Sequence, residues 1–113
     1  MSDYCDDTIN VKKYQDGTAE TAQYPKEKAI EYLALGLVSE AGEVAGKVKK
    51  FIRGDQPNMD IDALSAELGD VMWYVSQLAN ELDLNLGIIM YDNLLKLESR
   101  AKRGKIQGDG DNR

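Results

Sequence analysis

Two long stretches of the chain repeat apolar residues at the spacing of an α-helix, and this pattern limits the possible fold more than any other feature. The first stripe consists of Ile30, Leu33, Leu37, Ala41, Val44, Val48 and Ile52. The second consists of Ile61, Leu64, Leu68, Val71, Val75, Ala79 and Leu82. No segment shows sustained alternation of apolar and polar residues or enrichment in β-branched residues, so strands are not expected. The sequence therefore predicts an all-α protein.

Residues that begin or end helices divide the chain into four predicted helices. These span about residues 6–16, 25–52, 60–83 and 86–102. Suitable residues stand at the boundaries: Pro25, Asp60, Asp62 and Asn85 at the starts, and Gly54 and Gly104 at the ends. With 113 residues the chain has room for one domain, which we expect at residues 1–104, followed by a mobile tail at residues 105–113.

The chain has no histidine and one cysteine, Cys5, and this composition excludes several kinds of site. Intrachain disulfides, ordinary zinc sites, and Ser–His or Cys–His catalytic pairs all need residues that are absent. The net charge of −6 argues against non-specific binding of a nucleic acid duplex. No apolar run reaches membrane length and no signal peptide is recognised, so we expect a cytoplasmic protein without a membrane partner. Carboxylates are the chemistry that remains.

The two long predicted helices carry the related segments SEAGEV and AELGDV. At about 100° per residue, Glu40 and Glu43 lie on one flank of their stripe, and Glu67 and Asp70 on the equivalent flank of theirs. A short loop makes the helices antiparallel neighbours, so the four carboxylates converge beside the seam. A single pair of this kind is usually a solvated flank, but two converging pairs repel and favour a hard divalent cation, Mg²⁺ or Mn²⁺. Gly36 lies on the same flank, where a side chain would block approach; the alternative is that Gly36 serves close helix packing.

Three segments, YLALGLVSEAGEVAGKVKKFIRG, LSAELGDVMWYVSQLANELDL and YDNLLKLESRAKRG, resemble the small single-domain MazG-like nucleoside triphosphate pyrophosphohydrolases of bacteria and phages. The resemblance covers most of the chain, from TAQYP to the tail. The family pattern Glu-Glu-x-x-Glu, a spacer, then Glu-x-x-Asp falls on Ser39, Glu40, Glu43, Glu67 and Asp70.

The resemblance implies an antiparallel helical bundle completed by oligomerisation, as a homodimer or homotetramer. It implies that Glu40, Glu43, Glu67 and Asp70 form the catalytic site and bind Mg²⁺. The implied reaction splits a nucleoside triphosphate into the monophosphate and pyrophosphate, which would cleanse the nucleotide pool. Ser39 departs from the first Glu of the pattern, so a general-base role at that position is not carried over. Without histidine, a carboxylate or a metal-bound hydroxide accepts the proton.

Basic and aromatic residues near these motifs are candidates for substrate binding. Lys47 lies one turn beyond Glu43 on the acidic flank, and Tyr74 lies one turn beyond Asp70, where its ring can pack on a nucleobase or on another subunit. By resemblance, Asn93 and Lys96 of the last helix contact the nucleotide. Arg100 belongs to the same basic segment. The alternative for the charged and amide residues is an exposed helix face.

The last predicted helix has apolar residues on more than one face, which predicts burial on two sides and hence a homo-oligomer. These residues are Ile88, Tyr91 and Leu95 on one face and Met90, Leu94 and Leu97 on another. Trp73 points away from the seam and is predicted to pack on another helix or subunit. The runner-up function is a non-enzymatic helical interaction module whose acidic face binds a basic partner. A ferritin-like redox site is excluded because its Glu-x-x-His motifs need histidine.

Overall fold

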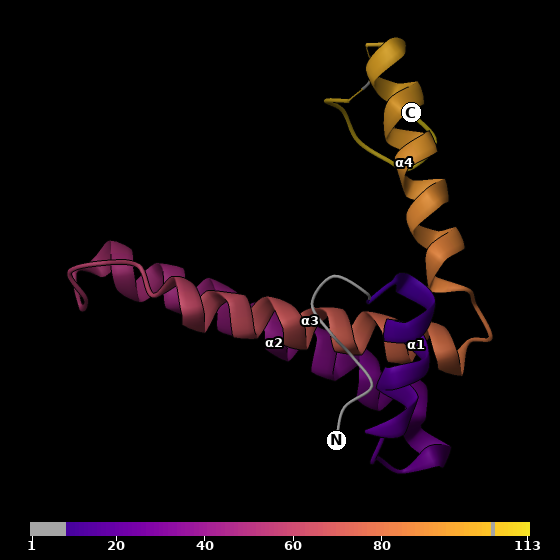
Figure 1. Cartoon of the computed structure of the whole chain (residues 1–113). Coiled ribbons are helices and arrows are strands. Elements are labelled where there is room, and N and C mark those ends of the chain that lie inside the picture. The colour runs from indigo at the N-terminus through magenta and orange to yellow at the C-terminus, as the bar shows by residue number, and fades with distance from the viewer. Residues whose placement is uncertain (1–8, 105) are drawn as a thin grey trace.

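The computed structural model describes residues 9–104 and 106–113, and within these ranges the chain is all-helical (Figure 1). Its helices are α1 (Val11–Glu20), α2 (Ala29–Arg53), α3 (Ile61–Glu81) and α4 (Leu86–Lys102), with a 3₁₀ turn, η1 (Lys26–Lys28), directly before α2. The predicted all-α fold class is confirmed.

Side-chain caps begin three of the four helices. In each case the capping side chain accepts a hydrogen bond from the backbone N–H three residues later; the caps are Asn10, Asp60 and Asn85. Gly54 ends α2 in the left-handed conformation, at a φ of 91°. The predicted starts of α3 and α4 and the predicted end of α2 thus follow from local hydrogen bonding and backbone freedom.

The predicted position of the first helix is wrong. The sequence placed it at residues 6–16, whereas α1 runs from Val11 to Glu20; Cys5 and residues 6–8 lie outside the described residues. Gly17 does not end α1, because Thr18 is buried against α3, with its hydroxyl oxygen 3.0 Å from that of Ser76. This tertiary contact outweighs the low helix propensity of glycine.

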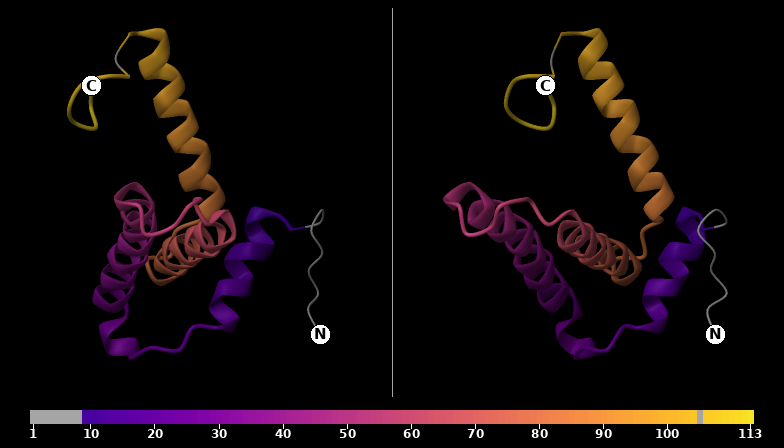
Figure 2. Two further views of the ribbon diagram at one scale, coloured as in Figure 1. Left: turned by 90° about the vertical axis from the view of Figure 1, so that its left-hand side faces the viewer. Right: turned by 60° about the vertical axis from the view of Figure 1, so that its left-hand side comes forward.

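Helices α2 and α3 run antiparallel, side by side, and α1 packs across the C-terminal half of α3 (Figures 1 and 2). Helix α4 begins beside the end of α3 and then points away from the α2–α3 pair (Figure 2). Among the described residues, four apolar side chains are buried: Ala29, Leu33, Ala79 and Leu86. The core is therefore small, and it lies at the start of α2, the end of α3 and the start of α4.

A hydrogen-bonded polar seam joins α1 to α3. It consists of Gln15, Thr18, Ser76, Gln77 and Asn80. The Asn80 amide donates to the backbone carbonyl of Gln15 at 3.0 Å and to the side-chain oxygen of Gln77 at 2.9 Å. Every buried side-chain nitrogen and oxygen within the described ranges has a hydrogen-bond partner. The seam therefore holds α1 in place without leaving a buried polar group unpaired.

Much apolar surface of the single chain is open to solvent. The radius of gyration is 16.9 Å, against about 13 Å for a compact domain of this length. Leu35, Val38 and Ile52 of α2 are 72%, 70% and 77% exposed, and most of the apolar side chains of α4 are exposed as well. Within the described residues, no helix is both long enough and apolar enough to span a membrane. The fold thus places α2, α3 and α4 around surfaces that this chain alone does not cover.

Candidate metal centre

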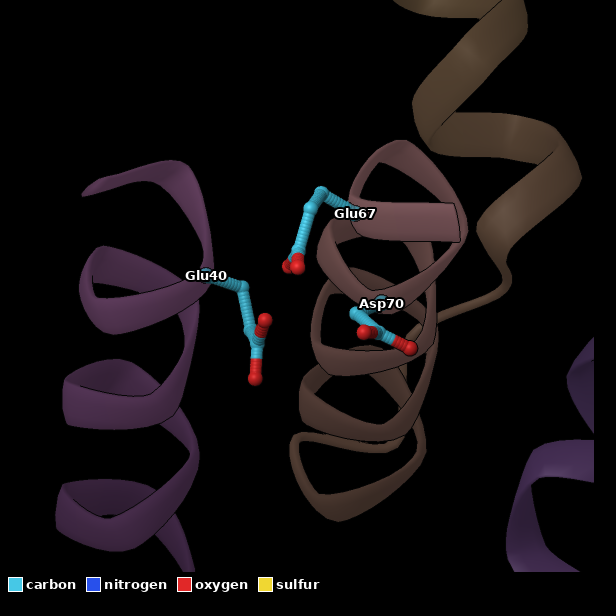
Figure 3. Close-up of side chains that lie close together, drawn as sticks. All are labelled: Glu40, Glu67 and Asp70. Atoms are coloured by element: carbon cyan, nitrogen blue, oxygen red, sulfur yellow. The ribbon is translucent and has the colours of Figure 1, made fainter. Parts of the chain in front are cut away.

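Three carboxylates from two helices meet between α2 and α3. One carboxylate oxygen from each of Glu40, Glu67 and Asp70 lies within 4.8 Å of the other two (Figure 3). Glu67 and Asp70 are about one turn apart on α3, so both reach the flank that faces Glu40 of α2. Glu40 and Glu67 are partly buried and Asp70 is exposed. We call these three residues the acidic cluster.

Negative charge accumulates in the acidic cluster. Burial raises the pKa of Glu40, and a hydrogen bond with Glu67 and the charges of Asp70, Glu67 and Glu43 raise it further. Within residues 9–104 and 106–113, no lysine or arginine forms an ion pair with any of the three carboxylates. The described part of the chain therefore supplies no ion-pair partner for these three carboxylates.

The donor set of the acidic cluster suits a hard divalent cation, because all three ligands are oxygens. Octahedral Mg²⁺ binds oxygens at about 2.1 Å, so its oxygen ligands lie roughly 3 to 4.2 Å apart. The oxygens of Glu40, Glu67 and Asp70 lie within 4.8 Å of one another, so the three residues are candidates to hold such an ion together.

Glu43, the fourth predicted ligand, has a different position. It lies on α2, about one turn beyond Glu40, and its side chain is exposed. It is near enough for its charge to raise the pKa of Glu40, yet it is not a member of the group of oxygens within 4.8 Å. The structure thus brings together three of the four predicted ligands, and a ligand role for Glu43 stays a prediction.

A cavity of about 400 Å³ opens beside the acidic cluster. Its wall consists of Thr21, Gln23, Tyr32, Glu40, Asp70, Trp73 and Tyr74. The sequence placed Trp73 away from the contact between the two long helices. In the structure Trp73 lines the cavity, and its indole N–H donates to the hydroxyl of Thr21 at 2.8 Å. The rings of Trp73 and Tyr74 meet edge to face with centroids 5.1 Å apart. The cavity thus combines carboxylates with aromatic surface.

The close approach of Tyr74 to α2 depends on Gly36. A β-carbon at position 36 would lie 2.1 Å from Cε1 of the Tyr74 ring, far inside van der Waals contact. Of the two explanations that the sequence offered for Gly36, an open approach to the site and close helix packing, the structure supports close packing, because Tyr74 of α3 takes the space. Burial raises the pKa of Tyr74, and the nearby Tyr32 and Glu40 raise it further, so its hydroxyl keeps its proton at neutral pH.

The other predicted substrate-binding residues do not line this cavity. Lys47 is partly buried farther along α2, and Asn93 is exposed on α4. Lys96 and Arg100, also on α4, form ion pairs with Asp111. Because α4 points away from the α2–α3 pair (Figure 2), one chain does not bring these residues to the acidic cluster, and their binding roles stay predictions.

Sequence reasoning missed Thr21, Gln23 and Tyr32 in the cavity wall. A signal for Tyr32 existed, since Tyr32, Gly36 and Glu40 follow one another at intervals of four residues and so share a flank of α2. Thr21 and Gln23 come from the connector between α1 and η1, where no periodicity relates residues to a neighbouring helix. Another aromatic residue, Tyr14 of α1, lies close to Asp70. Burial raises the pKa of Tyr14, and the charge of Asp70 raises it further.

The chain is similar to known proteins over most of its length. The family model for the MazG nucleotide pyrophosphohydrolase domain matches residues 28–104, a range that contains the whole acidic cluster. The Gene 37 protein of Mycobacterium phage L5 is 49% identical over 114 residues, covering 93% of this chain and 100% of the phage protein. No solved structure matches the chain. On the family match, which extends over more than half of its residues, the chain belongs to the MazG nucleotide pyrophosphohydrolase family.

Proposed function

We propose that this chain hydrolyses a nucleoside triphosphate to the monophosphate and pyrophosphate, with Mg²⁺ as cofactor and Mn²⁺ as a possible substitute. The observation that carries the proposal is the convergence of Glu40, Glu67 and Asp70 beside a cavity with three aromatic rings. Membership of the MazG family supports the reaction type. The proposed setting is the cytoplasm, and the proposed purpose is the removal of unwanted nucleotides from the pool.

Different residues of the site would bind the triphosphate and the nucleobase of the substrate. The acidic cluster holds the cation, which, when bound, offsets the charge of the triphosphate and lowers the pKa of a water molecule. The rings of Tyr32, Trp73 and Tyr74 offer flat surface on which a nucleobase packs. Because the chain has no histidine, the proton lost by the attacking water would go to a carboxylate or to a metal-bound hydroxide.

We also propose that the active form is a homodimer or homotetramer in which α4 of a second chain completes the site. The apolar side chains exposed on α2 and α4 support this, since monomers seldom leave so much apolar surface uncovered. Asn93, Lys96 and Arg100 would then serve the site of a neighbouring chain. Light scattering at micromolar concentration should detect no monomer. A stable and fully active monomer would contradict the assembly.

Pyrophosphate release tests the reaction. The full chain is incubated with a panel of standard and altered ribo- and deoxyribonucleoside triphosphates, in Mg²⁺ and in EDTA, and both products are quantified. We expect equal amounts of monophosphate and pyrophosphate in Mg²⁺, with one base or sugar preferred, and neither product in EDTA. Release of inorganic phosphate instead, or no product from any nucleotide, would contradict the proposal and favour the interaction module.

A further inference from the structure

The segment 106–113 folds back beside the C-terminal half of α4 (Figures 1 and 2). Arg103 of α4 donates from Nη2 to the carbonyl oxygen of Arg113 at 2.8 Å. Arg113 in turn donates to the carbonyl oxygens of Gly110, at 2.6 Å, and Ile106, at 2.9 Å. The segment therefore closes on itself and on α4 through hydrogen bonds. We call it the C-terminal tail.

Asp111 of the C-terminal tail binds two basic residues of α4 with one carboxylate oxygen. Nζ of Lys96 lies 2.7 Å from Oδ1 of Asp111, and Nη2 of Arg100 lies 3.1 Å from the same oxygen. Arg100 also donates from Nη2 to the backbone carbonyl of Asp111. Lys96 and Arg100 are four residues apart, so they share one face of α4. Two cations thus converge on a single anionic oxygen.

The C-terminal tail, and not the packing of α4 on the other helices, buries Arg100. Arg100 is 4% exposed, whereas every residue from Ile88 to Lys102 except Lys96 and Arg100 is exposed. Packing between α4 and the other helices therefore does not bury Arg100, and the described segment that bonds to it is the C-terminal tail. A buried guanidinium requires an anionic partner, and Asp111 supplies it.

A lysine and an arginine that share one carboxylate oxygen have the geometry and charge that also bind a phosphate oxygen. Lys96 and Arg100 already have a proposed role in binding the substrate. We propose that Asp111 of the C-terminal tail occupies this pair until a phosphate-bearing ligand displaces it. The effect on turnover rests on the proposed function, whereas the binding itself does not.

The contact of Asp111 is of a kind that a ligand can replace. The Asp111 side chain is 76% exposed, so a ligand in solution can reach its contact with Lys96 and Arg100, whereas the Arg100 side chain is only 5% exposed. A phosphate chain offers several anionic oxygens to the same two cations, where the C-terminal tail offers one carboxylate and one carbonyl. Asp109, two residues earlier in the same tail, has no hydrogen bond or ion pair within the described residues, which makes it a matched control.

Calorimetric titration with inorganic tripolyphosphate in EDTA tests the proposal on the full chain. Asp111→Asn and Asp109→Asn each remove one negative charge from the same tail. We expect Asp111→Asn to bind tripolyphosphate about three to ten times more tightly than the parent, the range set by losing one competing ion pair. Asp109→Asn should match the parent. Lys96→Ala, combined with Asp111→Asn, should remove this gain.

Three results would overturn the proposal. Equal affinities for the parent and Asp111→Asn would mean that Asp111 does not compete. Equal gains in Asp111→Asn and Asp109→Asn would mean that overall charge, not a site on α4, controls binding. Absence of binding by all the proteins would mean that no phosphate site exists there. Since EDTA excludes both the cation and hydrolysis, these results are independent of whether the chain is a pyrophosphohydrolase.

Discussion

The acidic cluster between α2 and α3 and the basic pair on α4 are opposite in more than sign. Glu40, Glu67 and Asp70 lie close together and receive no cation from the described part of the chain. Lys96 and Arg100 also lie close together, but the C-terminal tail provides them with Asp111. The acidic cluster thus has no ion-pair partner in the described residues, whereas Lys96 and Arg100 have one in Asp111.

The difference predicts opposite responses to ligands. Without a cation, mutual repulsion in the acidic cluster destabilises the fold, so a bound cation should stabilise the protein both by binding and by removing that repulsion. At the basic pair a phosphate ligand has to replace an existing ion pair, so part of its binding free energy is offset. The experiments below measure how each of the two groups of residues affects activity, stability and titration.

The largest effect should come from Glu67→Gln, which keeps the shape of the side chain and removes one charge from the acidic cluster. Pyrophosphate release should fall by at least about 100-fold, or roughly 3 kcal/mol of transition-state stabilisation. Steady-state kinetics in Mg²⁺ measures it. Glu31→Gln is the control, because Glu31 is exposed and lies on the opposite side of α2 from Glu40. Retained activity in Glu67→Gln would contradict the assignment of the metal site.

The next effect concerns the packing beside the acidic cluster. Gly36→Ala should destabilise the protein by about 1–3 kcal/mol, because the new β-carbon displaces the ring of Tyr74. Gly42→Ala on the same helix meets no atom within 4 Å and should be neutral or stabilising by up to about 1 kcal/mol. Denaturant unfolding of both variants gives the comparison. Equal stabilities would mean that Tyr74 does not lie against Gly36.

A smaller effect should appear in the stability of the metal-free protein. In EDTA, Glu67→Gln should be more stable than the parent by on the order of 1 kcal/mol or less, because one repelling charge is gone. Excess Mg²⁺ should then stabilise the variant less than the parent. Thermal unfolding in both conditions measures this, and identical melting in EDTA would show that the carboxylates do not repel in the fold.

Lowering the pH should reduce the difference in stability between the parent and Glu67→Gln in EDTA. The pKa of Glu40 is raised in the folded chain, so the folded state takes up a proton at higher pH than the unfolded state does. The destabilisation is therefore present above the folded-state pKa and is lost as the pH falls toward the ordinary glutamate value. In EDTA, the stabilities of parent and Glu67→Gln should converge as the pH is lowered from neutral toward the ordinary glutamate pKa of about 4.3.

The smallest effect lies at the basic pair. Hydrogen bonds from Lys96, and then from Arg100, lower the pKa of Asp111. The contact with the C-terminal tail should therefore persist above the ordinary aspartate pKa of about 3.9 and be lost only below it. Carboxyl carbon chemical shifts followed by NMR should show Asp111 titrating below the ordinary aspartate value in the parent, and closer to that value in Lys96→Ala. Equal titration of Asp111 in parent and Lys96→Ala would show that Asp111 does not bind the basic pair.

The sequence predicted the elements that depend on local chemistry. Caps such as Asp60 and Asn85 determine where α3 and α4 begin, because each satisfies a free backbone N–H. The meeting of Glu40 with Glu67 and Asp70 followed from equal angular offsets on two antiparallel helices, which is geometry that the sequence carries. Glu43 lies farther around α2 than Glu40, and its exposure reflects that difference.

Contacts between a helix and an irregular segment were beyond such reasoning. Thr21 and Gln23 reach the cavity wall from a connector, and Asp111 reaches α4 from the C-terminal tail. No repeat in the sequence relates either segment to its partner. The extension of α1 past Gly17 was missed for the same reason, since it depends on the burial of Thr18 against a residue 58 positions away.

The polar seam fixes the position of α1 along α3. Two helices that meet through hydrocarbon can slip past each other at little loss, but hydrogen bonds hold only one register. Sliding α1 by one turn would break the bonds of Thr18 with Ser76 and Gln77, at about 0.5–1.5 kcal/mol for each lost hydrogen bond. Thr21 directly follows α1 and holds Trp73. A helix that contributes no carboxylate thus sets the alignment of the wall against which the substrate would rest.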